Sequence, residues 1–161
     1  MTTSEYNKCV DLHSDGIYRF ILKQIGDPDK AHDIVQEAFI RLWKKVKTVN
    51  ADKAKSYLFT TAYHCFIDNI RTDKRINTLR EYNRGDNVSY NSYNDLEEII
   101  NEAVEKLPSI QKSVVLLRDY EGYSYKEIGE ITNLKESQVK VYIFRARKFL
   151  KTYLVSMDVL V

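Results

Sequence analysis

The last third of the chain, residues 121–148, has the pattern of a short helix, a tight turn and a long basic helix. Ser124 and Glu127 match a capping box, in which each side chain accepts from the other residue's backbone N–H at a helix start. Asn133 suits the turn, because asparagine tolerates the left-handed backbone conformation. The second helix places four apolar residues on one face: Val139, Ile143, Ala146 and Leu150. This segment predicts a helix-turn-helix, a motif that inserts its second helix into the major groove of DNA.

Charge is segregated along the chain. Residues 135–153 hold six Lys or Arg and one acid, which gives +5, whereas residues 94–134 hold four Lys or Arg and nine acids, which gives −5. The whole chain carries only +2. A basic helix beside an acidic surface orients on a polyanion such as DNA. A solvated helix balanced by its neighbour would show the same charges, so the motif and the charge are needed together to favour DNA binding.

Composition favours helices and disfavours several classes of protein. The 161 residues include 5 Gly and 2 Pro, too few for a turn-rich β fold. No apolar run reaches the roughly 18–20 residues that span a bilayer, and no apolar core follows the first residues, so we expect no signal peptide and no membrane insertion. Cys9 and Cys65 lie far apart, which suits reduced thiols and a cytoplasmic location.

An enzyme is the least favoured class. The three histidines lie on separate stretches without metal-ligand spacing, and no phosphate-binding Gly loop or nucleophile elbow is present. We therefore expect no catalytic residues, no metal site and no cofactor.

Three helices are expected in the N-terminal part. The first covers about residues 6–25 and ends at Gly26, after which Asp27 and Pro28 match the N-cap and first position of the next helix. The second has the cleanest helical period in the chain, with one apolar face: Ala31, Ile34, Val35, Ala38, Phe39, Leu42, Trp43 and Val46. The third covers about residues 52–75.

The third helix is basic and aromatic. Residues 53–75 carry five positive residues and two acids, with Tyr57, Tyr63 and His64 among them. Its expected exposed side holds Thr60, Tyr63, His64, Asp68, Arg71, Lys74 and Arg75. Such a surface suits single-stranded nucleic acid, because cations follow phosphates and rings stack on unpaired bases. An ordinary amphipathic helix with a basic end is the alternative.

The fold class expected is all-α, with two small helical domains joined by a flexible linker. The linker, residues 77–94, is polar and has no helical period. Residues 1–76 and 95–161 are each long enough for a marginal core of their own. In the second domain, a helix capped by Asn94 or Asp95 precedes one that Pro108 begins, and the helix-turn-helix follows.

These motifs together resemble one family. Residues 33–43 (DIVQEAFIRLW), 56–62 (SYLFTTA), 68–71 (DNIR), 107–112 (LPSIQK), 121–128 (EGYSYKEI), 139–140 (VK) and 145–148 (RARK) are similar in order and spacing to an extracytoplasmic-function (ECF) sigma factor. These bacterial initiation factors of the sigma-70 family have only the sigma-2 and sigma-4 domains. The resemblance covers about residues 6–154.

The resemblance implies a role for each surface. Domain 1–76 would dock on the β′ clamp of core RNA polymerase through Asp33, Gln36, Glu37 and Arg41. The same domain would melt and read the −10 element as single-stranded DNA, capturing a flipped base at a cost of a few kcal/mol. The residues at or near that site are Asn50, Lys53, Lys55, Tyr63, His64, Asp68, Arg71, Lys74 and Arg75. The linker would run along polymerase channels.

The second domain would bind the β flap and read the −35 element as duplex. The residues that would face DNA are Lys135, Glu136, Ser137, Gln138, Lys140, Val141, Arg145 and Lys148. Gln138 and Lys140 are expected to read bases, and Arg145 and Lys148 to contact phosphates. An anti-sigma factor is a further partner that the family implies.

The chain departs from the family pattern in four places. Many members have Asn where His64 falls and Trp where Tyr57 falls, which puts the −10 base preference in doubt. The recognition helix usually starts with Ser, but here Lys135 holds that place and cannot cap, so this end is expected to fray until DNA orders it. Val141 and Tyr142 stand where a small residue and Arg are frequent, which implies an unusual −35 sequence.

A two-domain transcription regulator is the alternative function, with a C-terminal helix-turn-helix that binds an operator and N-terminal helices that form a ligand or dimer module. It shares the helix-turn-helix but leaves the basic, aromatic third helix unexplained.

Overall fold

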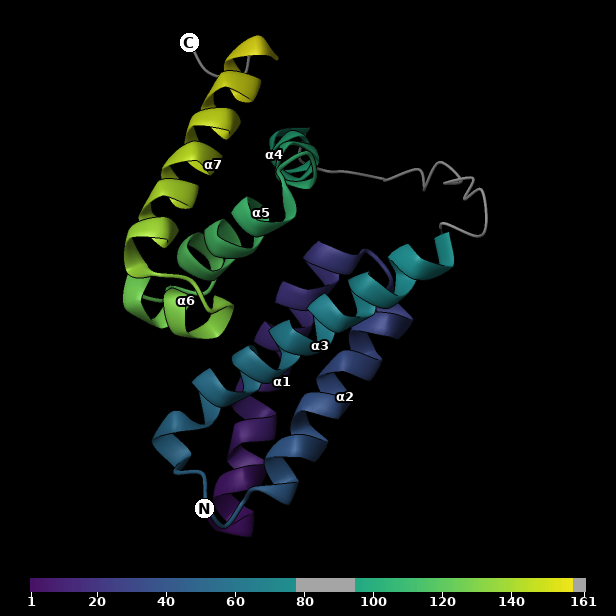
Figure 1. Cartoon of the computed structure of the whole chain (residues 1–161), viewed down its shortest axis with the longest axis vertical. Helices are drawn as coiled ribbons and strands as arrows, with labels where there is room; N and C mark the ends of the chain where they lie inside the picture. The colour runs from purple at the N-terminus through teal and green to yellow at the C-terminus, as the bar shows by residue number, and fades with distance from the viewer. Residues whose placement is uncertain (78–94, 158–161) are drawn as a thin grey trace.

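The structure, a computed structural model, describes residues 1–77 and 95–157. The described residues form helices α1 (Thr3–Ile25), α2 (Pro28–Lys44), η1 (Ala51–Lys53), α3 (Ala54–Asn77), α4 (Asp95–Glu105), α5 (Ser109–Val115), η2 (Leu116–Tyr120), α6 (Tyr125–Thr132) and α7 (Glu136–Ser156). Residues 78–94, almost all of the predicted linker, lie outside the described ranges. The all-α fold with two helical domains is confirmed (Figure 1). In residues 1–77 and 95–157, no helix is both long and apolar enough to cross a membrane.

The N-terminal bundle consists of α1, α2 and α3, which pack side by side. Thr2 and Glu5 form a capping box, so α1 begins three residues earlier than its apolar period predicts. Asp27 caps α2 and Pro28 takes its first position, as expected. The apolar face of α2 is buried as expected, apart from its last members: Trp43 is 47% exposed and Val46 is half-buried. Trp43 instead packs against Tyr6 of α1, with ring centroids 4.9 Å apart.

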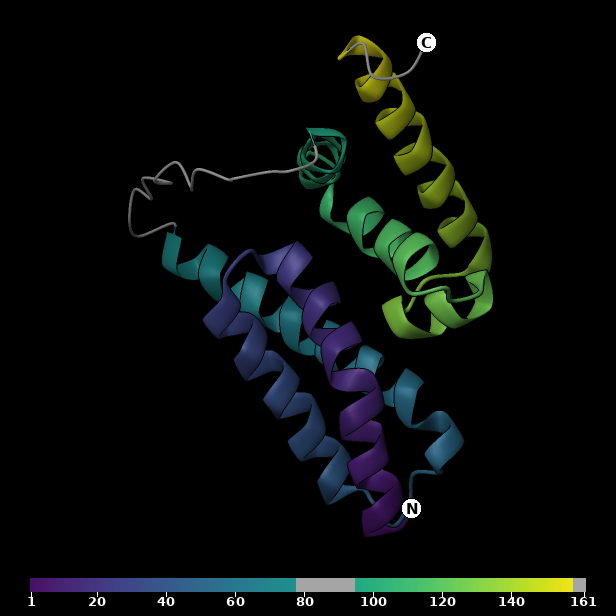
Figure 2. The ribbon, with the colours of Figure 1, turned by 180° about the vertical axis from the view of Figure 1, so that it is seen from behind.

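The C-terminal bundle consists of α4 to α7, with α7 packed along α4, α5 and α6 (Figure 2). Pro108 precedes α5, and α5 continues without a break into η2, a π-helical turn. The expected capping box is present, because the Glu127 N–H donates to Ser124 Oγ and the Ser124 N–H donates to Glu127 Oε1, both at 3.2 Å. Asn133 has the expected left-handed conformation, with φ of 59°.

Gly129 allows α6 to approach the turn closely. A Cβ atom at this position would lie 2.7 Å from the backbone oxygen of Leu134. We predict that Gly129→Ala lowers the free energy of unfolding by roughly 1–3 kcal/mol through this overlap. Urea unfolding followed by circular dichroism measures the change. An Ala elsewhere in a helix stabilises by about 1 kcal/mol relative to Gly. A variant more stable than the unaltered protein would therefore show that the turn shifts to accommodate the Cβ atom without loss of stability.

Candidate nucleic-acid interface

The eight residues expected to face the −35 DNA lie on the outward side of α7 and at its N-cap, Lys135. Lys135, Glu136, Ser137, Gln138, Lys140, Val141, Arg145 and Lys148 are all exposed. The opposite face is anchored, because Val139, Ile143 and Ala146 are buried and Leu150 is half-buried. The short α6 and the left-handed residue Asn133 turn the chain so that α7 presents its N-terminal residues to solvent. This arrangement is that of a helix-turn-helix recognition helix.

The N-terminus of α7 is held by a residue that sequence reasoning assigned to base reading. The Lys135 side chain makes no capping hydrogen bond, as expected, but its backbone N–H donates to Gln138 Oε1 at 2.9 Å. Gln138 therefore orders the helix start in the free protein. With its oxygen occupied, the amide group of Gln138 presents N–H donors outward.

A shallow groove of about 560 Å³ lies along α7 beside the start of α6. It is lined by Tyr125, Lys140, Ile143, Phe144, Arg147, Lys148 and Lys151. The Tyr125 ring lies between two cations, with Arg118 Cζ 4.5 Å and Lys140 Nζ 5.7 Å from its centroid. Lys140 also pairs with Glu136 at 3.7 Å. The groove combines positive rims with an apolar floor, a combination that suits the sugar-phosphate backbone.

Sequence reasoning missed Phe144. Its side chain is 68% exposed, at the same groove as Lys148. The signal was present in the spacing, since Val141, Phe144 and Lys148 recur at helical intervals on one face. A large exposed ring on a helix face that otherwise carries cations is a candidate contact for sugars or a thymine methyl group.

The residues expected at the −10 site lie on α3 and on the segment before it that includes η1, and they differ in exposure. Asn50, Lys53, His64, Asp68 and Arg71 are exposed. Tyr63 is only 5% exposed, which corrects the expectation that it lies on the exposed side of α3. Lys55 is half-buried. Lys74 and Arg75 belong to α3, but their side chains lie outside the described part of the structure.

Burial also acts on the acid-base properties of Tyr63. It raises the pKa of the phenol, and the Ser113 hydroxyl of the C-terminal bundle opposes that rise. Ser113 is 50 residues away in the sequence, so no periodicity along α3 could reveal that it acts on Tyr63.

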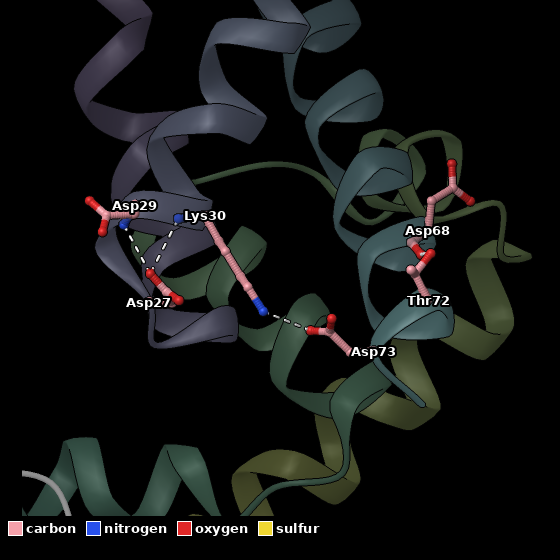
Figure 3. A network of polar contacts seen from close by, with 6 residues as sticks. All are labelled: Asp27, Asp29, Lys30, Asp68, Thr72 and Asp73. Carbon is pink, nitrogen blue, oxygen red and sulfur yellow. Dashed lines mark hydrogen bonds and ion pairs between the residues drawn. The ribbon is translucent and has the colours of Figure 1, made fainter. Parts of the chain in front are cut away.

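The end of α3 is fixed against the start of α2 by a small polar network, drawn in Figure 3. Lys30 Nζ donates to Asp73 Oδ2 at 3.0 Å, while Asp27 Oδ1 accepts from the Asp29 and Lys30 backbone N–H groups. Thr72 Oγ1 donates to the Asp68 backbone oxygen at 3.0 Å. Of these contacts, the Lys30–Asp73 pair joins α3 to α2 near Arg71, while the others order the start of α2 and the last turns of α3 locally.

The face of α2 expected to bind core polymerase is also continuous. Asp33, Gln36 and Arg41 are exposed and Glu37 is half-buried. Glu37 Oε1 accepts from Arg41 Nε at 2.8 Å, an i,i+4 pair that keeps both groups on this face. In both views α2 lies on the side of its bundle away from the C-terminal bundle (Figures 1 and 2).

A protein with two helical modules and an exposed helix-turn-helix belongs to the DNA-binding transcription proteins. The family models for Sigma-70 region 2 and for Sigma-70, region 4 match residues 9–76 and 97–150. RNA polymerase sigma factor SigV of Bacillus subtilis (strain 168) is 30% identical over 156 residues, covering 93% of this chain and 91% of that protein. ECF RNA polymerase sigma factor SigM of the same strain is 29% identical over 146 residues, covering 87% and 89%. The chain belongs to the ECF subfamily of sigma-70-family RNA polymerase sigma factors, which act in transcription initiation.

Two solved structures share the fold. The sigma factor RpoE in complex with the anti-sigma factor NepR from Bartonella quintana superposes with a TM-score of 0.81, at 22% identity, over 94% of this chain and 98% of that chain. CnrH in complex with the cytosolic domain of CnrY gives a TM-score of 0.68, at 19% identity, over 94% and 88%.

Proposed function

We propose that this sigma factor recognises its promoters with two separate surfaces. The exposed face of α7 reads the −35 duplex in the major groove, and the exposed side of α3 with the loop before it captures the unpaired −10 strand. The observation that carries the proposal is that all eight expected −35 residues are exposed, on α7 and at its N-cap, opposite the buried side of the helix. The face of α2 around Asp33 and Glu37 docks on the β′ clamp of core polymerase, and the C-terminal bundle contacts the β flap.

The two DNA surfaces suit different forms of DNA. On α7, the start of the helix presents short polar side chains such as Ser137 and Gln138 to base edges, and Lys148 lies further along beside phosphates. On α3, exposed His64 offers a ring for stacking, while Arg71 offers a cation. Polymerase supplies the chemistry, and the sigma factor supplies position and strand capture.

An anti-sigma factor is a proposed partner. The two solved structures named above are complexes, one of them with a protein named as an anti-sigma factor. Copurification from the native cell, followed by mass spectrometry of a one-to-one complex, identifies the anti-sigma factor. A chain recovered only with core polymerase would count against such a partner.

Two substitutions on α7 separate base reading from phosphate contact. We expect Gln138→Ala to flatten base preference at one −35 position, because a lost base contact removes about 1–3 kcal/mol of discrimination. We expect Lys148→Ala to weaken binding to all sequences alike and to reduce the salt dependence by about one phosphate contact. Binding of holoenzyme to a −35 library at several salt concentrations measures both effects. Loss of base preference in Lys148→Ala, with none in Gln138→Ala, would reverse the assignment.

A further inference from the structure

Glu136 is the single acid in the basic segment that contains the recognition helix. Residues 135–153 hold six Lys or Arg and no other Asp or Glu. The Glu136 side chain is 53% exposed and stands at the first position of α7. A carboxylate at this place repels the phosphates of DNA and lowers the affinity for every sequence alike. It improves recognition only where it meets a hydrogen-bond donor on the DNA.

A role in helix stability alone would also place an acid here. An acid in the first turn interacts favourably with the helix dipole, and Glu136 with Lys140 forms an i,i+4 ion pair. Such exposed pairs contribute little to stability, and the start of α7 is already ordered by Gln138, whose Oε1 accepts from the Lys135 N–H at 2.9 Å. Both stabilising effects act equally with every DNA sequence. A purely structural Glu136 therefore predicts no change in base preference when it is replaced.

Lys140 places a cationic donor beside the Glu136 carboxylate. Lys140 Nζ lies 3.7 Å from Glu136 Oε1 and 5.7 Å from the centroid of the Tyr125 ring. Arg118 fixes that ring in turn, because its Cζ lies 4.5 Å from the ring centroid and its Nη1 donates to the Tyr123 backbone oxygen at 2.9 Å. Both members of the Glu136–Lys140 pair are more than half exposed. The first turns of α7 therefore present an acceptor and a cationic donor side by side to solvent.

The major-groove edge of a C·G base pair is complementary to this pair of side chains. Cytosine presents its N4 donor there, and the guanine beside it presents the O6 and N7 acceptors. A Glu carboxylate accepts from cytosine N4, and a Lys ammonium donates to guanine O6 and N7. In an A·T pair the adenine N6 donor lies between two acceptors, adenine N7 and thymine O4, which repel a carboxylate. The arrangement of Glu136 and Lys140 therefore favours C·G over A·T.

We propose that Glu136 and Lys140 together read one C·G base pair of the −35 element, with Glu136 on the cytosine and Lys140 on the guanine. Glu136 is then a specificity-determining residue, because its repulsion from phosphates is offset only at the base pair that donates to it. The ion pair persists in the complex, since a carboxylate has a second oxygen and an ammonium group has three N–H donors. This inference rests on the proposed function of α7 and adds the base pair that the helix selects.

Selection from promoters with a randomised −35 element tests the proposal, with holoenzyme assembled from core polymerase and the full chain. We expect the unaltered protein to enrich a C·G pair at one position. Glu136→Gln should lower that preference about tenfold and shift it toward adenine, because glutamine pairs with adenine N6 and N7. Glu102→Gln removes the same charge from an exposed site on α4 and should leave every preference unchanged.

Joint reading of one base pair predicts that the two substitutions are not additive. Lys140→Ala should lower preference at the same position, and Glu136→Gln with Lys140→Ala should lower it little beyond the stronger single change. Affinity of Glu136→Gln for unselected DNA should rise about threefold at low salt, because a repulsive charge is removed. Effects at two different base pairs would overturn joint reading. Weaker binding of Glu136→Gln to all sequences, with base preference unchanged, would reduce Glu136 to a structural role and overturn the proposal.

Modified bases at the selected position test each contact at a single atom. N4-methylcytosine removes the N4–H that faces the major groove, and 7-deazaguanine replaces the N7 acceptor with a C–H group. We expect the first to weaken binding of the unaltered protein about tenfold but not that of Glu136→Ala, and the second to have little effect on Lys140→Ala. Equal sensitivity of all three proteins would overturn the proposal. Failure of the unaltered protein to enrich any −35 element would instead contradict the proposed function itself.

Discussion

Reversing the charge of Asp33 and Glu37 together to Lys is expected to weaken binding to core RNA polymerase about tenfold or more, which corresponds to ~1.4 kcal/mol or more. Asp33 is exposed and Glu37 is half-buried, and α2 lies on the side of its bundle away from the C-terminal bundle (Figures 1 and 2). The fold should persist, because Glu37 loses only an exposed ion pair with Arg41, and such pairs contribute little to stability. Titration of labelled protein with core enzyme measures the affinity.

Asp11→Lys with Asp15→Lys supplies a matched control. These residues are exposed, have the same i,i+4 spacing and lie on α1, so the change in charge is identical. We expect core affinity to stay within about twofold in this control, since exposed charges away from an interface change affinity little. Equal losses in the two double variants would show that net charge, and not the α2 face, governs binding to polymerase.

Replacing Arg71 and Lys74 together with Ala is expected to reduce open-complex formation about tenfold while leaving core affinity nearly unchanged. Arg71 is exposed near the end of α3, and a cation there follows the phosphates of the displaced strand. Fluorescence of 2-aminopurine placed in the −10 element reports melting directly. The core affinity of the same variant is measured in parallel.

Lys8→Ala with Lys126→Ala removes the same charge from exposed sites outside the proposed interfaces and serves as the control. We expect it to melt promoters as the unaltered protein does. If the Arg71 and Lys74 variant lost core binding and melting to the same degree, the assignment of these residues to strand capture would be rejected.

Local rules explain which features the sequence alone could predict. The period of α2 predicts its buried face, because a helix that packs on one side repeats its apolar residues every three or four positions. Ser124 with Glu127, and Asp27 with Pro28, act on backbone groups within a few residues, so the helix starts that they predict are present. The outward face of α7 follows from the same reasoning.

Contacts between distant segments explain what the sequence could not predict. Tyr63 is buried, and one of the groups that act on its pKa, Ser113, belongs to the other bundle. Trp43 lies one residue before the end of α2 and stays 47% exposed, although its ring contacts Tyr6 of α1. Gly129 carries no sequence signal of its own, since only the return of the chain at Leu134 makes a side chain costly.

Gln138 shows how a single residue can mislead. Its position at the start of α7 predicts a base reader, but in the free protein its oxygen accepts from the Lys135 N–H. The expected fraying of α7 rested on the side chain of Lys135 alone. Instead, the side chain at the third helical position orders the helix start. It makes one of the two reciprocal hydrogen bonds of a capping box. This bond is compatible with base reading, because the amide donors stay available.

Transcription from a randomised promoter library, with purified core polymerase and this chain added, tests the central claim most directly. We predict that transcripts start at defined points downstream of two enriched elements, one near −35 and one near −10. Substitutions on α7 should alter only the upstream element, and substitutions on α3 only the downstream one. Transcripts that are absent, or that start without any enriched element, would contradict promoter recognition by these two surfaces.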